Sequence, residues 1–244
     1  MDALYIDPHA DPLHPLALLA TGQSGADIER AVREARAKAR RQQRPMTWVD
    51  IEVALLSAER APNAVLDRGI AVHEIGHAVV YTVLGIGEVS TVRIGGRGGV
   101  TDVTAPVERL QTEAGLTGLM TCFLAGRAAE ELFLGTVTIG SGGGPDSDLA
   151  KATDLAMEME GGFGIGPDMP LLYRHTEDRA LALMRDRGLA MRVNARLEAA
   201  YDVARRILHG HRDVAVDLAT RLQEGRVMDG EAVRAAISQA NTTS

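Results

Sequence analysis

Two histidines and one glutamate are the residues of this sequence best placed to do chemistry. His73, Glu74 and His77 follow the pattern H-E-x-x-H inside residues 70–80, an apolar stretch of helical length. Residues four positions apart lie on one face of a helix, so two imidazoles on adjacent turns can bind one Zn²⁺ without backbone strain. Glu74 lies beside them, where its carboxylate can accept a proton from a metal-bound water. The pattern therefore predicts a hydrolytic zinc site.

The alternative is a chance match, because histidines at this spacing also cap or line ordinary helices. However, burying a glutamate and two histidines in an apolar helix is costly unless their polar atoms have a partner. A metal ion supplies that partner. We therefore expect His73 and His77 to be metal ligands and Glu74 to be the general base.

A catalytic zinc site also needs a third protein ligand and an open position for water. A histidine six residues after the second is excluded, because that position holds Val83. Carboxylates further along remain: Glu130 and Glu131 lie within a predicted helix, and Asp146 and Asp148 lie at the start of another. Asp148 opens its helix after a glycine-rich loop that could fold back over the metal. An acid in a first helical turn is also explained by the helix dipole alone, so this reasoning leaves the third ligand open.

The composition is typical of a helical protein that binds no nucleic acid. The 244 residues are 45% hydrophobic and 24% charged, enough for one large domain or two modest ones. Aromatic residues make up only 3%, which favours helix packing over an aromatic-rich β-sandwich. The net charge of -7 gives no reason to expect nucleic-acid binding.

The lack of an internal disulfide and the lack of a membrane-spanning or signal segment predict a soluble, cytoplasmic chain. The single cysteine, Cys122, excludes an internal disulfide, suits a reducing compartment and is best interpreted as a buried structural thiol. No apolar run approaches the ~20 residues that span a bilayer, and the N-terminus lacks a signal-peptide pattern.

The first sixty residues contain two helix-start signals. Ser24 and Asp27 have capping-box spacing ahead of an apolar-periodic stretch, and Thr47 and Asp50 repeat that spacing before a second one. Residues 1–10 are predicted to be an irregular lead-in.

A basic run and a boundary follow from local composition. Residues 36–44 are strongly basic, but the overall negative charge favours a solvated helix end over a nucleic-acid patch. The segment 61–63, Ala-Pro-Asn, is typical of a boundary between two parts of the chain.

A short β element is predicted after the H-E-x-x-H helix, which glycines at 85 and 87 end. Residues 89–94 alternate in polarity, a glycine cluster at 95–99 interrupts them, and residues 100–103 resume. The glycine cluster lacks G-x-x-x-x-G-K-[ST], so a hairpin turn explains it better than a phosphate-binding loop.

Helices are predicted for most of the remainder. One runs from about 110 to 133, a flexible glycine-rich loop follows at 140–145, and another helix starts near 146. From residue 189 onward we expect two long helices separated near Gly210. The sequence contains no internal repeat.

Four motifs in order carry a resemblance to a known family. They are Ser-Gly-Ala-Asp at 24–27, His-Glu-Ile-Gly-His-Ala at 73–78, Gly-Arg-Ala-Ala-Glu-Glu-Leu at 126–132 and Asp-Leu-Ala-Lys-Ala-Thr at 148–153. In this order the chain resembles, from about Asp11 onward, the C-terminal portion of FtsH-type, membrane-anchored, ATP-dependent zinc metalloproteases.

The resemblance implies a role for each matching residue. His73 and His77 match the family's histidine ligands, Glu74 its general base and Asp148 its aspartate ligand. Glu130 becomes a candidate to hold a ligand imidazole from outside the metal shell. The approach to Asp148 departs from the family pattern, because it is longer and carries Ser in place of the usual Asn at position 147.

The resulting prediction is a mainly α protein: a helical zinc-metallopeptidase domain with a small β element, preceded by a helical lid-like segment. The expected divisions are a lead-in at 1–10, an AAA lid-like segment at 11–60 and the peptidase domain at 61–244. The family's membrane helices and P-loop ATPase core are not in this sequence. The chain is therefore expected to be either a fragment or a free-standing peptidase.

The resemblance also implies partners. We expect unfolded polypeptide substrates, a homo-hexamer, and an ATPase or a membrane-anchored parent chain, which would place the site on the cytoplasmic side of a membrane. The strand at 89–94 is expected to be the edge that an extended substrate joins. The alternative is a non-catalytic assembly module with a structural zinc site, which would have no need of Glu74.

Overall fold

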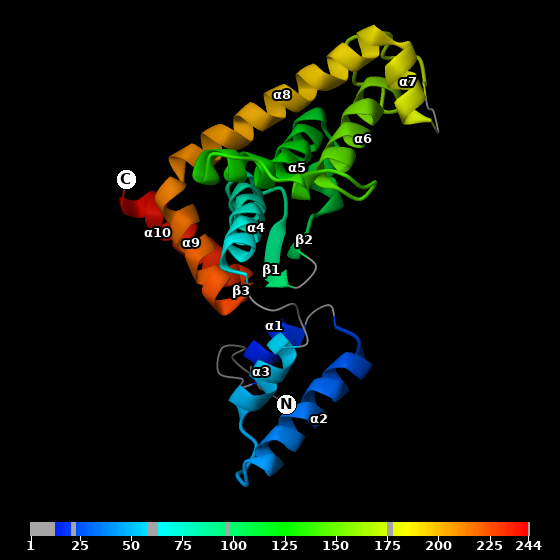
Figure 1. The fold of residues 1–244 in the computed structure, drawn as a ribbon. Helices are drawn as coiled ribbons and strands as arrows, with labels where there is room; N and C mark the ends of the chain where they lie inside the picture. The colour runs from blue at the N-terminus through cyan, green and yellow to red at the C-terminus, as the bar shows by residue number, and fades with distance from the viewer. Residues whose placement is uncertain (1–12, 21–22, 58–62, 96–97, 175–177, 244) are drawn as a thin grey trace, which may run out of the picture.

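The computed structural model describes residues 13–20, 23–57, 63–95, 98–174 and 178–243 (Figure 1). Within them the chain is mainly helical with one small three-stranded sheet, which confirms the predicted fold class. None of the described helices is long and apolar enough to cross a membrane. The predicted lead-in at 1–10 lies outside these residues.

The N-terminal helices form a small unit with its own core. They are α1 (His14–Ala20), α2 (Gly25–Arg41) and α3 (Trp48–Ser57). Alanines at 31 and 35 pack against Ile51, Ala54 and Leu55 of α3. Because the α2 side of this core is built from alanines, the two helices can approach closely.

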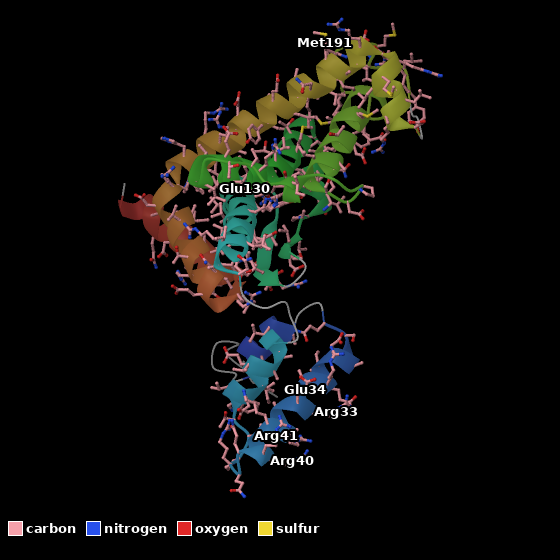
Figure 2. The ribbon with its side chains drawn as sticks, viewed as in Figure 1. Arg33, Glu34, Arg40, Arg41, Glu130 and Met191 are labelled. Atoms are coloured by element: carbon pink, nitrogen blue, oxygen red, sulfur yellow. The ribbon has the colours of Figure 1, made fainter. Side chains whose placement is uncertain are left out.

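Both predicted start signals lie at helix starts. Ser24 and Asp27 form a reciprocal capping box at α2, and the Thr47 N–H donates to the Asp50 carboxylate just before α3. The basic run ends in solvent as predicted, since Arg40 and Arg41 are exposed and project from α2 (Figure 2). These local signals are confirmed because the groups that make them are neighbours in sequence.

The H-E-x-x-H segment lies in α4 (Ala64–Leu84), which packs against α5 (Glu113–Leu134). Gly85 ends α4 in the left-handed conformation, with φ at 60°, as the glycine pattern predicted. A Cβ on Gly76 would lie only 2.6 Å from the Cβ of Ala129. The missing side chain therefore brings α4 close to α5, where the two histidines face the second helix.

The predicted hairpin is confirmed, but its strand order corrects one expectation. The sheet consists of β1 (Glu88–Gly95), β2 (Gly98–Thr104) and β3 (Val227–Asp229), in the order β2-β1-β3 with both pairings antiparallel. β1 was expected to be the edge that a substrate joins. That expectation is wrong, because β3 returns from the C-terminal region and pairs with the second side of β1. The edge beside the H-E-x-x-H helix is β2.

The remaining elements cover this centre. They are the 3₁₀ turns η1 (Val107–Leu110) and η2 (Ile139–Ser141), and the helices α6 (Asp148–Gly161), α7 (Arg179–Arg185), α8 (Arg187–Gly210), α9 (Arg212–Gly225) and α10 (Gly230–Thr243). The long helix α8 runs along α5 and α6 (Figure 1). The predicted break near Gly210 is confirmed, since α8 ends there.

The prediction of only two C-terminal helices is wrong, since α10 and the strand β3 follow α9. Arg226 ends α9 in the left-handed conformation, with φ at 63°. Gly230 then lies against β1, where a Cβ would overlap the carbonyl group of Val89. Strand pairing with β1 therefore interrupts what sequence periodicity suggested was one helix.

Candidate metal centre

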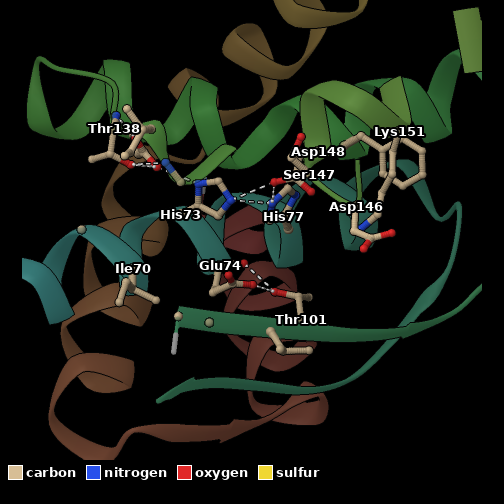
Figure 3. A pocket seen from close by; sticks show the side chains of 18 of the residues that line it. Ile70, His73, Glu74, His77, Thr101, Thr138, Asp146, Ser147, Asp148 and Lys151 are labelled. Carbon is tan, nitrogen blue, oxygen red and sulfur yellow. Dashed lines mark hydrogen bonds and ion pairs between the residues drawn. The ribbon is translucent and has the colours of Figure 1, made fainter. Parts of the chain in front are cut away.

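A cavity of about 680 Å³ lies beside the H-E-x-x-H residues (Figure 3). One wall is α4, another is the first half of β2, and η2 with the start of α6 completes it. Elements far apart in sequence thus meet at one place.

Each histidine is held through its Nδ1 atom by an acceptor from α5. The Nδ1 of His73 lies 2.7 Å from Oε1 of Glu130, and the Nδ1 of His77 lies 2.8 Å from the carbonyl oxygen of Cys122. An ionised carboxylate and a carbonyl can only accept, so both Nδ1 atoms carry the proton. In the neutral imidazoles the two Nε2 atoms therefore present lone pairs.

These lone pairs converge with a carboxylate oxygen. The two Nε2 atoms lie 3.0 Å apart, and Oδ2 of Asp148 lies 3.0 Å from that of His73 and 3.3 Å from that of His77. Three acceptors this close repel one another unless a cation lies among them. Within the described part of the chain, these three residues form the one group of His, Cys, Asp and Glu side chains with metal-binding spacing. Two nitrogens and one carboxylate oxygen suit Zn²⁺ and leave a position for water.

The electrostatics of the group also favour a bound cation. Burial by itself lowers the pKa of His73, but hydrogen bonds to Asp148 and Glu130 outweigh burial and raise that pKa to about 10. Burial raises the pKa of Asp148, yet its hydrogen bonds to His73 and His77 hold the pKa well below the usual range. The surroundings therefore stabilise positive charge between these side chains, as a proton or as a metal ion that displaces it.

Glu74 faces the same cavity from α4 but contacts the sheet. Its side chain is buried, and the hydroxyl of Thr101 on β2 donates to its Oε2 at 2.8 Å (Figure 3). Gly99, two residues earlier, lies directly against the Glu74 side chain. The carboxylate is thus fixed between α4 and the edge strand.

The four carboxylates considered for the third ligand occupy different places. Asp148 joins the two histidines, while Glu130 reaches only the far nitrogen of His73. Glu131 points toward α8, where it accepts from the hydroxyl of Tyr201. Asp146 lines the cavity but is not in the metal-binding group.

Asp146, which lies two residues before Asp148, does not cap α6. The cap is Ser147, whose hydroxyl accepts from the N–H of Ala150. Asp148 is therefore the first residue of the helix, where its side chain reaches the histidines from the helix end.

Several residues at the site were missed from the sequence. Thr101 and Gly99 contact Glu74, and the N–H and hydroxyl of Thr138 both donate to Glu130. None has a distinctive local pattern, since threonines and glycines are frequent near turns. Only the hairpin pattern could have indicated that β2 returns toward α4.

Comparison with known proteins agrees with this geometry. The sequence pattern of peptidase family M41 matches residues 64–236. The chain is 33% identical, over 93% of its length, to a Sphaerobacter thermophilus protein named ATP-dependent zinc metalloprotease FtsH 2. It is 31% identical, over 96% of its length, to a protein of the same name from Symbiobacterium thermophilum. The chain spans only 36% and 42% of the lengths of these two relatives.

Proposed function

The chain belongs to peptidase family M41, and we propose from this premise that it is a zinc-dependent endopeptidase that hydrolyses unfolded polypeptides. The observation that carries the proposal is the convergence of three acceptor atoms, from His73, His77 and Asp148, beside a buried glutamate. The relatives' names describe zinc metalloproteases, which is the chemistry that such a donor set supports.

Three side chains would hold the metal and a fourth would orient one of them. His73 and His77 would bind through Nε2 and Asp148 through Oδ2, while Glu130 fixes the ring of His73 from its far side. When bound, zinc acidifies a water molecule and polarises the scissile carbonyl.

Glu74 would perform the proton transfers. Its carboxylate accepts a proton from the attacking water and later gives it to the departing amine of the cleaved peptide bond. A buried carboxylate held at the cavity wall is suited to this task, because it is positioned before the substrate arrives.

The substrate would bind as an extended strand along β2. This strand pairs with β1 on one side, and residues 98–101 line the cavity on the other. Main-chain hydrogen bonds to an edge strand select an extended backbone rather than a particular sequence. Most of the backbone of a folded protein is already paired internally, so unfolded polypeptides present such a segment most readily.

The wider assembly is part of the proposal. The relatives are named ATP-dependent, and this chain spans about two fifths of their length. We propose that residues 11–60 are an AAA lid-like segment and residues 61–244 the peptidase domain. Both would work in a hexameric ring with an ATPase, on the cytoplasmic side of the membrane where the parent chain is membrane-anchored.

Zinc content and proteolysis, measured on the same preparations, test the proposal. Glu74→Gln should keep about one equivalent of zinc but cleave a labelled, unfolded protein at least about 100-fold more slowly than wild type. His73→Ala and His77→Ala should lose the metal, since two protein ligands hold zinc too weakly.

Two results would contradict the proposal. A Glu74→Gln variant that keeps most of its activity would refute the general-base role. A zinc-loaded wild type that cleaves nothing would favour the alternative, a non-catalytic module with a structural zinc site.

A further inference from the structure

A single hydroxyl group connects the sheet to the glutamate of the site. The hydroxyl of Thr101 lies 2.8 Å from Oε2 of Glu74 and 3.1 Å from the Glu74 backbone carbonyl. Both contacts join β2 to α4 across 27 positions in sequence. Within the described part of the chain no other residue hydrogen-bonds to this carboxylate, so Thr101 determines which of its two oxygens is engaged.

The neighbouring glycine shapes the same contact. A Cβ on Gly99 would lie 2.3 Å from Cγ and 2.5 Å from Oε1 of Glu74. The backbone of Gly99 is not in the left-handed region, so its lack of a side chain serves this close approach and not a turn. Gly99 and Thr101 point to the same face of β2, because side chains alternate along a strand.

We propose that Thr101 is a positioning residue for Glu74, and this inference rests on the proposed function. The Thr101 hydroxyl donates to Oε2, which leaves Oε1 to accept the proton of the attacking water. Gly99 provides the room in which the carboxylate takes this orientation. The hydrogen bonds of the Thr101 hydroxyl go to Glu74 and not to a metal ligand, so Thr101 would act on the reaction through Glu74.

The arrangement also links substrate binding to the general base. Gly99 and Thr101 belong to the edge strand that an extended peptide would join, and both lie at the cavity. A peptide that pairs with β2 steadies the strand that holds Glu74. The inference therefore assigns β2 two tasks, which are to align the substrate and to orient the base.

Substitutions at Thr101 separate the hydroxyl from the shape of the side chain. Thr101→Val keeps the branched shape and removes the donor, whereas Thr101→Ser keeps the donor. A hydrogen bond to a charged group is worth enough for Thr101→Val to lower kcat about 10-fold or more. KM should change by less than about twofold, because the peptide contacts β2 through its main chain. Thr101→Ser should recover most of kcat.

Thr104→Val is the matched control, since Thr104 is exposed and lies at the end of the same strand, three residues beyond the contact with Glu74. It should behave as wild type. Zinc content should remain at about one equivalent in all three variants. Gly99→Ala is an independent variant, and by displacing Glu74 it should lower kcat in the same direction as Thr101→Val.

A binding measurement tests the same idea without turnover. Acetohydroxamic acid chelates zinc and gives its proton to a carboxylate placed as Glu74 is, so its affinity reports the position of that carboxylate. Calorimetry should show weaker acetohydroxamate binding to zinc-loaded Thr101→Val, by several-fold, and near wild-type binding to Thr101→Ser. Glu74→Gln should lose the affinity most strongly.

Three outcomes would overturn the inference: a wild-type kcat and hydroxamate affinity in Thr101→Val, an equal loss in Thr101→Ser, or a loss of zinc that accounts for the whole effect. Should the wild-type chain bind zinc but cleave nothing, the proposed function fails. The hydroxamate affinities would then still decide whether Thr101 positions Glu74.

Discussion

An aspartate with several polar neighbours occurs in each of two regions, buried in the first and half-buried in the second, and its surroundings differ between them. Asp50, in the N-terminal unit, accepts from both guanidinium nitrogens of Arg44 and from the N–H and hydroxyl of Thr47. Asp148, at the cavity, faces the Nε2 atoms of His73 and His77. Each of these imidazole rings already carries a proton on its Nδ1 atom. The first carboxylate is satisfied by donors, whereas the second faces nitrogens that donate to it only when a further proton binds.

The difference distinguishes a structural carboxylate from the proposed metal ligand. The donors around Asp50 satisfy both of its carboxylate oxygens. This group therefore stabilises a loop and a helix start without a bound ion. The imidazole nitrogens around Asp148 leave a deficit of positive charge that a proton or a metal ion would fill. Glu160 belongs to the first kind, since Arg192 and Arg196 both pair with it.

Replacing Asp148 should have the largest effect on the cavity region. Asp148→Asn should weaken zinc binding by more than about 100-fold, beyond the effect expected of an outer partner, and abolish proteolysis. Asp50→Asn, the matched change in the other region, should leave zinc content and activity unchanged. Metal analysis after dialysis measures both, and a zinc-replete Asp148→Asn would overturn the ligand assignment.

Replacing Glu130 should have the next largest effect. Glu130→Gln keeps the size of the side chain but weakens its hold on the Nδ1 proton of His73, so zinc affinity should fall about 10–100-fold without being abolished. The two donors of Thr138 would also lose a charged acceptor. A complete loss of zinc in this variant, beside retention in Asp148→Asn, would exchange the two roles.

The pairing of Asp50 with Arg44 should make the stability of the N-terminal unit depend on pH. Hydrogen bonds from Arg44 and Thr47 hold the pKa of Asp50 well below its usual range. A lowered folded-state pKa adds stability above the unfolded value of about 3.9, and that stability is lost as the pH falls further.

Fluorescence of Trp48, the one tryptophan of the chain, reports unfolding of this unit. Asp50→Asn should therefore lower the urea midpoint of unfolding at pH 7. The difference in midpoint between the variant and the wild type should become smaller below about pH 4. If the difference in midpoint stayed constant down to pH 2, the pairing of Asp50 with Arg44 would not be the cause of the lost stability.

Replacing Asp146 should have the smallest effect. Ser147, and not Asp146, caps α6, and the carboxylate of Asp146 lies outside the ligand group. Asp146→Asn should therefore keep zinc content and change kcat/KM by less than about threefold. Removing the true cap by Ser147→Ala should cost about 1 kcal/mol in the free energy of unfolding, measured in urea. The prediction fails if Asp146→Asn releases the metal.

Much of the fold and part of the site could be predicted from neighbouring residues. The helix spacing of His73 and His77, the capping box at Ser24 and the glycine that ends α4 each depend on groups within a few positions of one another. Resemblance to a family added Asp148 and Glu130, whose distance in sequence hides their proximity to the histidines.

Other features were decided only by the tertiary structure. β3 pairs with β1 across more than 130 positions, which moves the free edge of the sheet to β2, and no local pattern marks that pairing. Thr101 meets Glu74 for the same reason, because the hairpin folds back over α4. The sequence alone determined which residues could bind a metal and move a proton. Long-range packing determined what holds them in place, since contacts across the chain depend on how helices and strands close on one another.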